Sequence, residues 1–443
     1  MKDVMKFRLA ASALLLMMGP LSYGQAVPAG GTAMTSGSGG PNSPSLDGIV
    51  HYALSASEII QLGYYGAGEV THSTVLSGDV AYQAKSTIRP FNLLFAGGVI
   101  LGNQSGQGTT YFTNVSVSQG YITRDWAFNI SDSFSFLPQS PTTGLSGIAG
   151  VGDLGSTPVQ GPVEGPAGGI FSVSGNRIAN SLNGSVERQF NRNTSISGGG
   201  SWSVLNYLDE NNGGLDSTQV SGVVALNRRL DARSSVSLDA VYSTYDYSGS
   251  AASGVPDIES RGINLSYQRV LSRTLSMSVS AGPQWISSSN STLIPSRVDA
   301  AVSANLSYSR RFTSAAVGYS HGVNAGSGVI AGAISDSVFA SLGHTFGRKW
   351  VASSSVGYSH STGLTQLSNG SSTAPVNEVY NTVFGGVQVT RAISSRFSGY
   401  LSYTAQNQTS NYPGISQNAL NGTSQTFGIG ITFTPRSTRL GQF

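Results

Sequence analysis

Strict alternation of apolar and polar residues, repeated in segment after segment, is the feature that most constrains the fold of this chain. In residues 427–433, Phe and Ile alternate with Gly and Thr, and in residues 275–282, Leu, Met, Val and Ala alternate with Ser and Gly. Residues 236–242 and 302–309 follow a similar pattern. Because successive side chains of a strand point to opposite faces of the sheet, each segment predicts a strand with one apolar face and one small, polar face.

A second regularity predicts the connections between these strands. An arginine stands two residues before a large apolar residue, and a tight polar turn follows, often with another arginine. Five such anchors begin at Arg188, Arg228, Arg269, Arg310 and Arg391, and a variant begins at His344. Successive anchors lie 34 to 47 residues apart. The repeating unit is therefore one hairpin plus one loop.

The other ends of the same strands are joined by longer segments rich in Gly, Ser, Asn and Pro, such as residues 249–256 and 411–421. Short turns at one end and long loops at the other are typical of a transmembrane antiparallel up-and-down β-barrel. Counting both strands at each tight turn predicts an all-β barrel of about 18 strands, with 16 as the alternative. The ring must close, because an open edge in hydrocarbon leaves backbone groups without hydrogen bonds.

Composition excludes several other classes of protein. Charged residues make up only 10% of the chain, against about 25% in an ordinary soluble domain, so a cytosolic enzyme is not expected. No cysteine is present, which rules out disulfides, Cys-ligated zinc and thiol catalysis. A formal net charge of +3 does not indicate a nucleic-acid surface. We expect no cofactor.

The N-terminal residues predict export from the cytoplasm. A basic start, a short apolar run and small residues before Gln25 are typical of a cleaved signal peptide over residues 1–24. Residues 25–47 read as a flexible periplasmic leader, because they hold too few apolar side chains to pack. The predicted barrel then covers residues 48–435, and residues 436–443 form a C-terminal tail.

The anchor arginines fall in the apolar phase of their strands, and Tyr267 and Tyr308 share it. An outward arginine costs about 2–4 kcal/mol at mid-bilayer but about 0–1 kcal/mol at the interface. Arg188, Arg228, Arg269, Arg310 and Arg391, with Tyr267 and Tyr308, are therefore predicted to mark the lower membrane boundary, where the arginines reach lipid phosphates. The alternative is that these arginines only end strand pairing and solvate the turns. Asp132 also falls in the apolar phase, which predicts either a β-bulge there or a wrong assignment of the phase.

Catalytic motifs are weak in this sequence. Five histidines are scattered without metal-ligand spacing. Residues 318–322 match the G-x-S-x-G pattern, which signals a nucleophile only at a strand-to-helix elbow. Here the pattern lies in a predicted strand, and a near copy follows at residues 357–361. Repeat architecture explains it better than catalysis, so we expect no enzyme.

With its signal peptide, its alternating strands and its closing strand over residues 425–433, the chain resembles the bacterial outer-membrane β-barrel superfamily, porin-like proteins in particular. The resemblance implies an assembly signal at a C-terminal aromatic residue, for which Phe433 and Phe443 both qualify. It also implies a third external loop folded into the lumen. That loop runs from about Pro138 to Arg177, and Asp153 and Glu164 are its candidate pore-constriction residues. The alternative is a mobile surface loop.

The expected function follows from a barrel too wide for side chains to fill. We expect an outer-membrane channel for passive diffusion of small polar solutes with weak charge selectivity. The alternative is a non-conducting structural or adhesive surface barrel, or the outer-membrane component of a larger assembly. The expected partners are outer-membrane lipids and small polar solutes, with self-association left open and no nucleic acid.

Overall fold

The structure, a computed structural model, is described for residues 48–63, 70–102, 109–137, 170, 176–208, 215–249, 254–326, 329–367, 376–411, 421–435 and 438–440. These residues form nineteen strands. The strands are β1 (Gly48–Leu62), β2 (Val70–Ala84), β3 (Phe91–Gly102), β4 (Thr110–Ile122), β5 (Trp126–Leu137), β6 (Arg177–Asn191), β7 (Thr194–Tyr207), β8 (Asp216–Arg229), β9 (Ser234–Ser248), β10 (Ile258–Val270), β11 (Leu275–Ser288), β12 (Arg297–Arg310), β13 (Thr313–Asn324), β14 (Ala333–Phe346), β15 (Trp350–Leu367), β16 (Val376–Ala392), β17 (Phe397–Ser410), β18 (Gly422–Phe433) and β19 (Thr438–Leu440).

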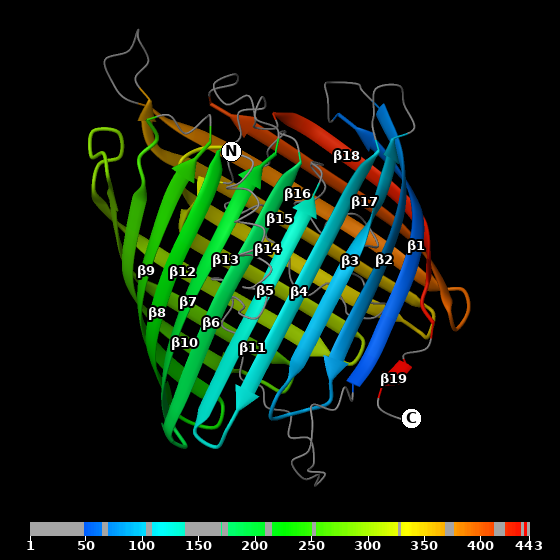
Figure 1. The fold of residues 1–443 in the computed structure, drawn as a ribbon, viewed down its shortest axis with the longest axis horizontal. Coiled ribbons are helices and arrows are strands. Elements are labelled where there is room, and N and C mark those ends of the chain that lie inside the picture. Colours follow the sequence, from blue (N-terminus) through cyan, green and yellow to red (C-terminus); the bar gives the residue numbers. More distant parts are fainter. Residues whose placement is uncertain are drawn as a thin grey trace, which may run out of the picture.

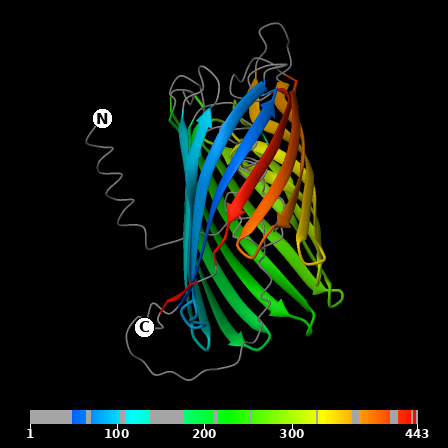
Figure 2. The same cartoon turned by 90° about the vertical axis from the view of Figure 1, so that its right-hand side faces the viewer.

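The strands close into a single up-and-down barrel (Figures 1 and 2). Each of the first eighteen pairs antiparallel with its neighbour in sequence, and β18 pairs with residues 54–62 of β1 to complete the ring. The short strand β19 pairs with residues 48–50 of β1, on the edge that β18 leaves free. The predicted transmembrane β-barrel is confirmed, with eighteen strands in its wall.

The two ends of the barrel have different connections, as predicted. Eight tight turns lie at the lower end in Figure 1, and nine longer connections join the strands at the upper end. The turn between β10 and β11 is closed by a hydrogen bond from the Leu271 amide to the Leu275 carbonyl, 2.9 Å long. The turn between β16 and β17 repeats it from Ile393 to Phe397, also at 2.9 Å. Both of these turns directly follow one of the arginine anchors.

The outer surface of the barrel is apolar. Leu401, Ile429 and Leu265 are 61%, 59% and 57% exposed, and they belong to the apolar phase of their strands. Soluble monomers rarely expose a continuous apolar surface of this extent, so hydrocarbon is the medium that fits it. Among the described residues, no helix has the length and apolar character needed to cross a membrane.

The inner surface is lined with small polar side chains that bond across neighbouring strands. The hydroxyl groups of Ser276 and Ser307 lie 2.6 Å apart, and those of Ser280 and Ser303 lie 2.8 Å apart. Such pairs satisfy one another's hydrogen-bonding groups on the inner face. The barrel therefore has its apolar side outward, the reverse of a soluble β-sandwich.

The β-bulge predicted near Asp132 is wrong. β5 pairs with β4 and β6 without a shift of register, so Asp132 keeps the outward phase that it shares with Phe128. Its carboxylate accepts a hydrogen bond of 3.0 Å from the side-chain amide of Asn180 on β6. This neighbour supplies a polar partner on the lipid-facing side, which removes the need to turn the aspartate inward.

Candidate functional site

The predicted boundary arginines all lie at the turn end of the barrel, and their side chains are exposed. Arg188 stacks over the ring of Trp126 at 5.1 Å, and Arg391 stacks over Trp350, also at 5.1 Å. Arg269 donates a hydrogen bond of 3.5 Å to the Tyr267 hydroxyl. These contacts hold guanidinium groups against amphipathic rings, an arrangement suited to a membrane interface.

The remaining predicted boundary residues are Arg228, Arg310 and Tyr308. Arg228 and Arg310 are exposed at the ends of β8 and β12, and Tyr308 is partly buried. Along β10, the apolar outward face lies between Arg261 and Arg269. Eight residues on a tilted strand span about 20 Å of membrane thickness. That height matches the apolar band of an outer-membrane barrel, while lipid contact by the arginines stays a prediction.

The repeated Gly-Tyr-Ser-His segments have a structural explanation. Tyr319 and His321 face outward near the upper end of β13, and both bond Asp336 on β14, at 2.7 and 2.8 Å. One hairpin later, Tyr358 and His360 on β15 bond Asn381 on β16 at 3.0 and 2.8 Å. In both hairpins, a tyrosine and a histidine bond the same polar side chain on the next strand. The motif therefore builds an aromatic and polar rim at the upper edge of the apolar belt.

The glycine and serine of the same segments face the lumen. A Cβ on Gly318 would lie 2.2 Å from the ring of Phe339, so glycine is needed to seat that inward ring. The hydroxyl of Ser320 pairs with that of Ser337 at 2.6 Å. Because alternation sends Ser320 inward and His321 outward, the two side chains lie on opposite faces of the sheet and do not form a nucleophile and base pair.

The candidate constriction residues Asp153 and Glu164 lie outside the described residues. Ile170, on the same connection between β5 and β6, is described and is fully buried. It packs in one cluster with Val329, Ile330, Ala333 and Tyr380. These partners belong to β14, β16 and the connection before β14. In a ring of eighteen strands, β6 and β15 are nine strands apart, so Ile170 lies across the mouth from the strands that flank its connection.

A second apolar cluster lies on the inner face at the upper end. Its buried members are Tyr245, Ile258, Ile286, Ile294, Ala325, Ile334 and Leu364, which come from β9 to β15 and the connections between them. Gly332 has a φ of 66°, and a Cβ there would meet the Ile258 side chain at 2.4 Å. Sequence reasoning missed this cluster. The signal was present in β9, where Tyr245 and Tyr247 continue the inward phase of Ser243.

The inner wall is unevenly covered. Thr382, Gln408, Ser424 and Ser359 face inward on β15 to β18 and are at most 1% exposed. Thr382 donates a hydrogen bond of 2.8 Å to Gln408. Ser260, at the upper end of β10, is 2% exposed as well, whereas the inward Ser266 and Ser307, nearer to the turn end, stay partly exposed. The lumen is therefore filled more tightly at the level of the upper clusters than at the level of Ser266 and Ser307.

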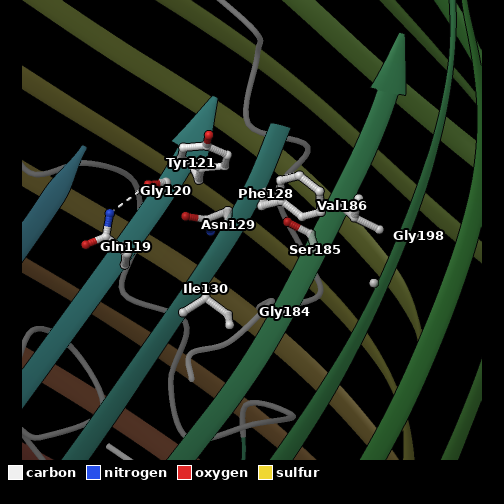
Figure 3. A pocket seen from close by; sticks show the side chains of 11 residues that line it. Gln119, Gly120, Tyr121, Phe128, Asn129, Ile130, Gly184, Ser185, Val186 and Gly198 are labelled. Atoms are coloured by element: carbon white, nitrogen blue, oxygen red, sulfur yellow. Dashed lines mark hydrogen bonds between the residues drawn. The ribbon is translucent and has the colours of Figure 1, made fainter. Parts of the chain in front are cut away.

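One hollow of about 500 Å³ lies on the outer face rather than in the lumen. Its floor is the small residues Gly184 and Gly198, and Tyr121, Phe128 and Ile130 stand around it on neighbouring strands (Figure 3). A Cβ on Gly198 would have only one neighbour, at 3.9 Å. The outward phase of these residues makes the hollow part of the lipid-facing surface.

The closed barrel, its apolar outer belt and its aromatic and basic edges define a transmembrane antiparallel β-barrel. No protein-family model and no curated protein matches the chain.

Similar solved structures come from Pseudomonas aeruginosa and Acinetobacter baumannii. The outer membrane protein opdK from Pseudomonas aeruginosa is 9% identical, with 89% of this chain and 100% of that chain covered and a TM-score of 0.43. OccK2 (OpdF) of the same organism, in complex with glucuronate, is 9% identical over 88% and 99% at 0.44. Acinetobacter baumannii OccAB4 is 9% identical over 89% and 99% at 0.42.

Proposed function

We propose that this protein is a passive outer-membrane channel for small polar solutes with weak charge selectivity. The observation that carries the proposal is the contrast between an apolar outer face and an inner face of Ser, Thr, Asn and Gln. Eighteen strands enclose more space than inward side chains of this size fill. Hydroxyl and amide groups suit uncharged polar solutes and water, and they give little discrimination by charge.

The connection between β5 and β6 is proposed to narrow this channel. Support comes from Ile170, which packs against the opposite side of the barrel, and from the covered inner face of β15 to β18. The connection carries Asp153 and Glu164, the two carboxylates proposed to stand at the constriction. Replacing Ile170 by Asp should release the contact with Tyr380 and raise single-channel conductance, whereas Ile170→Leu should leave it unchanged.

Planar-bilayer recording of the purified full-length mature protein tests the channel itself. Discrete conductance steps are expected, with a reversal potential close to zero under a salt gradient. A gel comparison of boiled and unboiled samples is the control, because an intact barrel migrates differently before heating. A heat-sensitive barrel that stays silent at all voltages would rule out the channel.

A non-conducting surface barrel is the second candidate. The covered inner wall near Tyr380 and the apolar cluster around Ile258 favour it, because both remove open space from the upper lumen. Such a barrel would present its upper connections to a partner. Silent recordings from both the native protein and the Ile170→Asp variant would favour this candidate.

The exposed arginines at the turn end are proposed to contact phosphates of the inner leaflet. Arg188 and Arg391 support this, because their guanidinium groups sit at interfacial tryptophans with their donors free to reach outward. Replacing both by Gln should weaken retention of anionic lipid in native mass spectra. Equal lipid retention would favour the alternative that these arginines only solvate the turns.

A further inference from the structure

The basic residues of the connections are confined to one end of the barrel. The eight tight turns contain ten Lys or Arg residues and two Asp residues. The basic ones are Lys85, Arg89, Arg124, Arg192, Arg233, Arg273, Arg311, Arg348, Lys349 and Arg396, and all are exposed. The turn end of the barrel is therefore a ring of positive charge.

The upper end has the opposite character. The described carboxylates at or beside the strand ends there include those of Asp216, Asp246, Asp257, Glu259, Asp299 and Glu378. Three arginines also lie near this end: Arg261 pairs with Glu259 at 2.9 Å, Arg297 pairs with Asp299 at 3.7 Å, and Arg177 begins β6. Acidic residues therefore outnumber basic ones in the described part of the upper end.

The lumen also holds a carboxylate, in the half nearer to the turn end. Asp239 faces inward on β9 and accepts hydrogen bonds from Ser237 at 2.6 Å and Ser266 at 3.3 Å. The main charge asymmetry is therefore between the two mouths, of which the upper one attracts cations and the other attracts anions.

We infer that the pore rectifies, passing more current when the compartment at the long-connection end is positive. This inference rests on the proposed channel function. With that polarity, cations enter through the acidic mouth and anions through the basic mouth, so both accumulate in the lumen. With the opposite polarity, each ion must enter through the mouth that repels it, and the lumen is depleted. Because the two mouths oppose each other, the reversal potential stays near zero.

The size of the barrel sets the salt at which this asymmetry acts. Eighteen tilted strands about 4.8 Å apart give a backbone radius of about 18 Å. The Debye length is about 30 Å at 0.01 M salt and about 3 Å at 1 M. Charges on the rim therefore reach the axis of the pore at low salt and are screened from it at high salt. Rectification should therefore appear at 0.01 M salt and vanish at 1 M salt.

The test is bilayer recording of the full-length mature protein at equal voltages of opposite sign. The current ratio is the current with the long-connection end positive divided by the current at the same voltage of opposite sign. It should be about 1.5 or more at 0.01 M salt and about one at 1 M. Orientation is fixed with Ser395→Cys, the single thiol in a cysteine-free chain. A negatively charged, membrane-impermeant thiol reagent should lower the ratio only when it is added on the turn side.

Charge variants separate electrostatics from shape. Replacing Arg192, Arg273, Arg348 and Arg396 together by Gln should bring the ratio toward one, and the matched Lys variant should keep it. An ohmic pore at low salt, rectification of the opposite sign, or a ratio unchanged by the Gln variant would overturn the inference and leave the channel standing. A native protein that never conducts would overturn the channel and this inference together.

Discussion

The two ends of the barrel are built by different physics. At the turn end, two to six residues reverse the chain, and hydrogen bonds between near neighbours, such as Leu271 to Leu275, hold each reversal. At the upper end, side chains distant in sequence pack on the inner face, as Ile170 does against Tyr380. Hydrogen bonds between near neighbours therefore close one end of this barrel, and packing between distant residues fills the other.

The largest effect is expected where a turn-end residue type is moved into the apolar belt. Leu265→Arg places a guanidinium on β10 midway between Arg261 and Arg269. The loss of stability should be about 3 kcal/mol, because an outward arginine near mid-bilayer leaves its hydration shell. Reversible unfolding from lipid vesicles in guanidinium measures it. The inward control Ser266→Arg should cost far less, and equal losses would mean that the outer face is not in hydrocarbon.

A smaller loss of stability is expected when a side chain in the packed upper end is truncated. Ile258 is 0% exposed in the inner cluster, and Ile258→Ala should cost about 2 kcal/mol, at the low end for such truncations, since the open lumen borders the cluster. The same unfolding assay applies. Leu271→Ala, in an exposed turn at the other end, is the matched control and should change stability little. A larger loss at Leu271 would reverse the comparison between the two ends.

The smallest effect concerns a single turn. Asp231 accepts hydrogen bonds from the Ser234 hydroxyl at 2.6 Å and from the amides of Arg233 and Ser234 at 2.6 and 2.8 Å. The Ser234 hydroxyl, followed by the Arg233 amide, lowers the pKa of this carboxyl below its ordinary value of 3.8. The turn should therefore be fully stabilised above that value and should lose these bonds as pH falls through the lowered pKa. An NMR titration of Asp231 measures it, and a pKa at or above 3.8 would contradict the expectation.

Sequence reasoning succeeded where the controlling interactions are local. Alternation between Leu265 and Ser266 shows at once which face of β10 is outward, because the period of a strand is fixed. The anchor at Arg269 likewise located the turn after β10. Both features depend on residues that are near neighbours in the chain.

It failed where a partner comes from a distant segment. The outward Asp132 suggested a bulge, because its partner Asn180 lies 48 positions away in sequence and on another strand. The burial of Ile170 could not be predicted for the same reason, since Tyr380 is more than two hundred residues further along the chain. Periodicity predicts which face of the sheet a side chain lies on, but it does not predict which distant residue will contact that side chain.

The seam between β1 and its two partners, β18 and β19, has a consequence for biogenesis. The pairing that closes the wall joins residues 54–62 to residues 425–433, so its loop-closure entropy is among the largest that the chain has to overcome. An N-terminal fragment keeps two unpaired edges and has no stable place in a bilayer. The unpaired chain must therefore be shielded from aggregation until β18 is available to pair with β1.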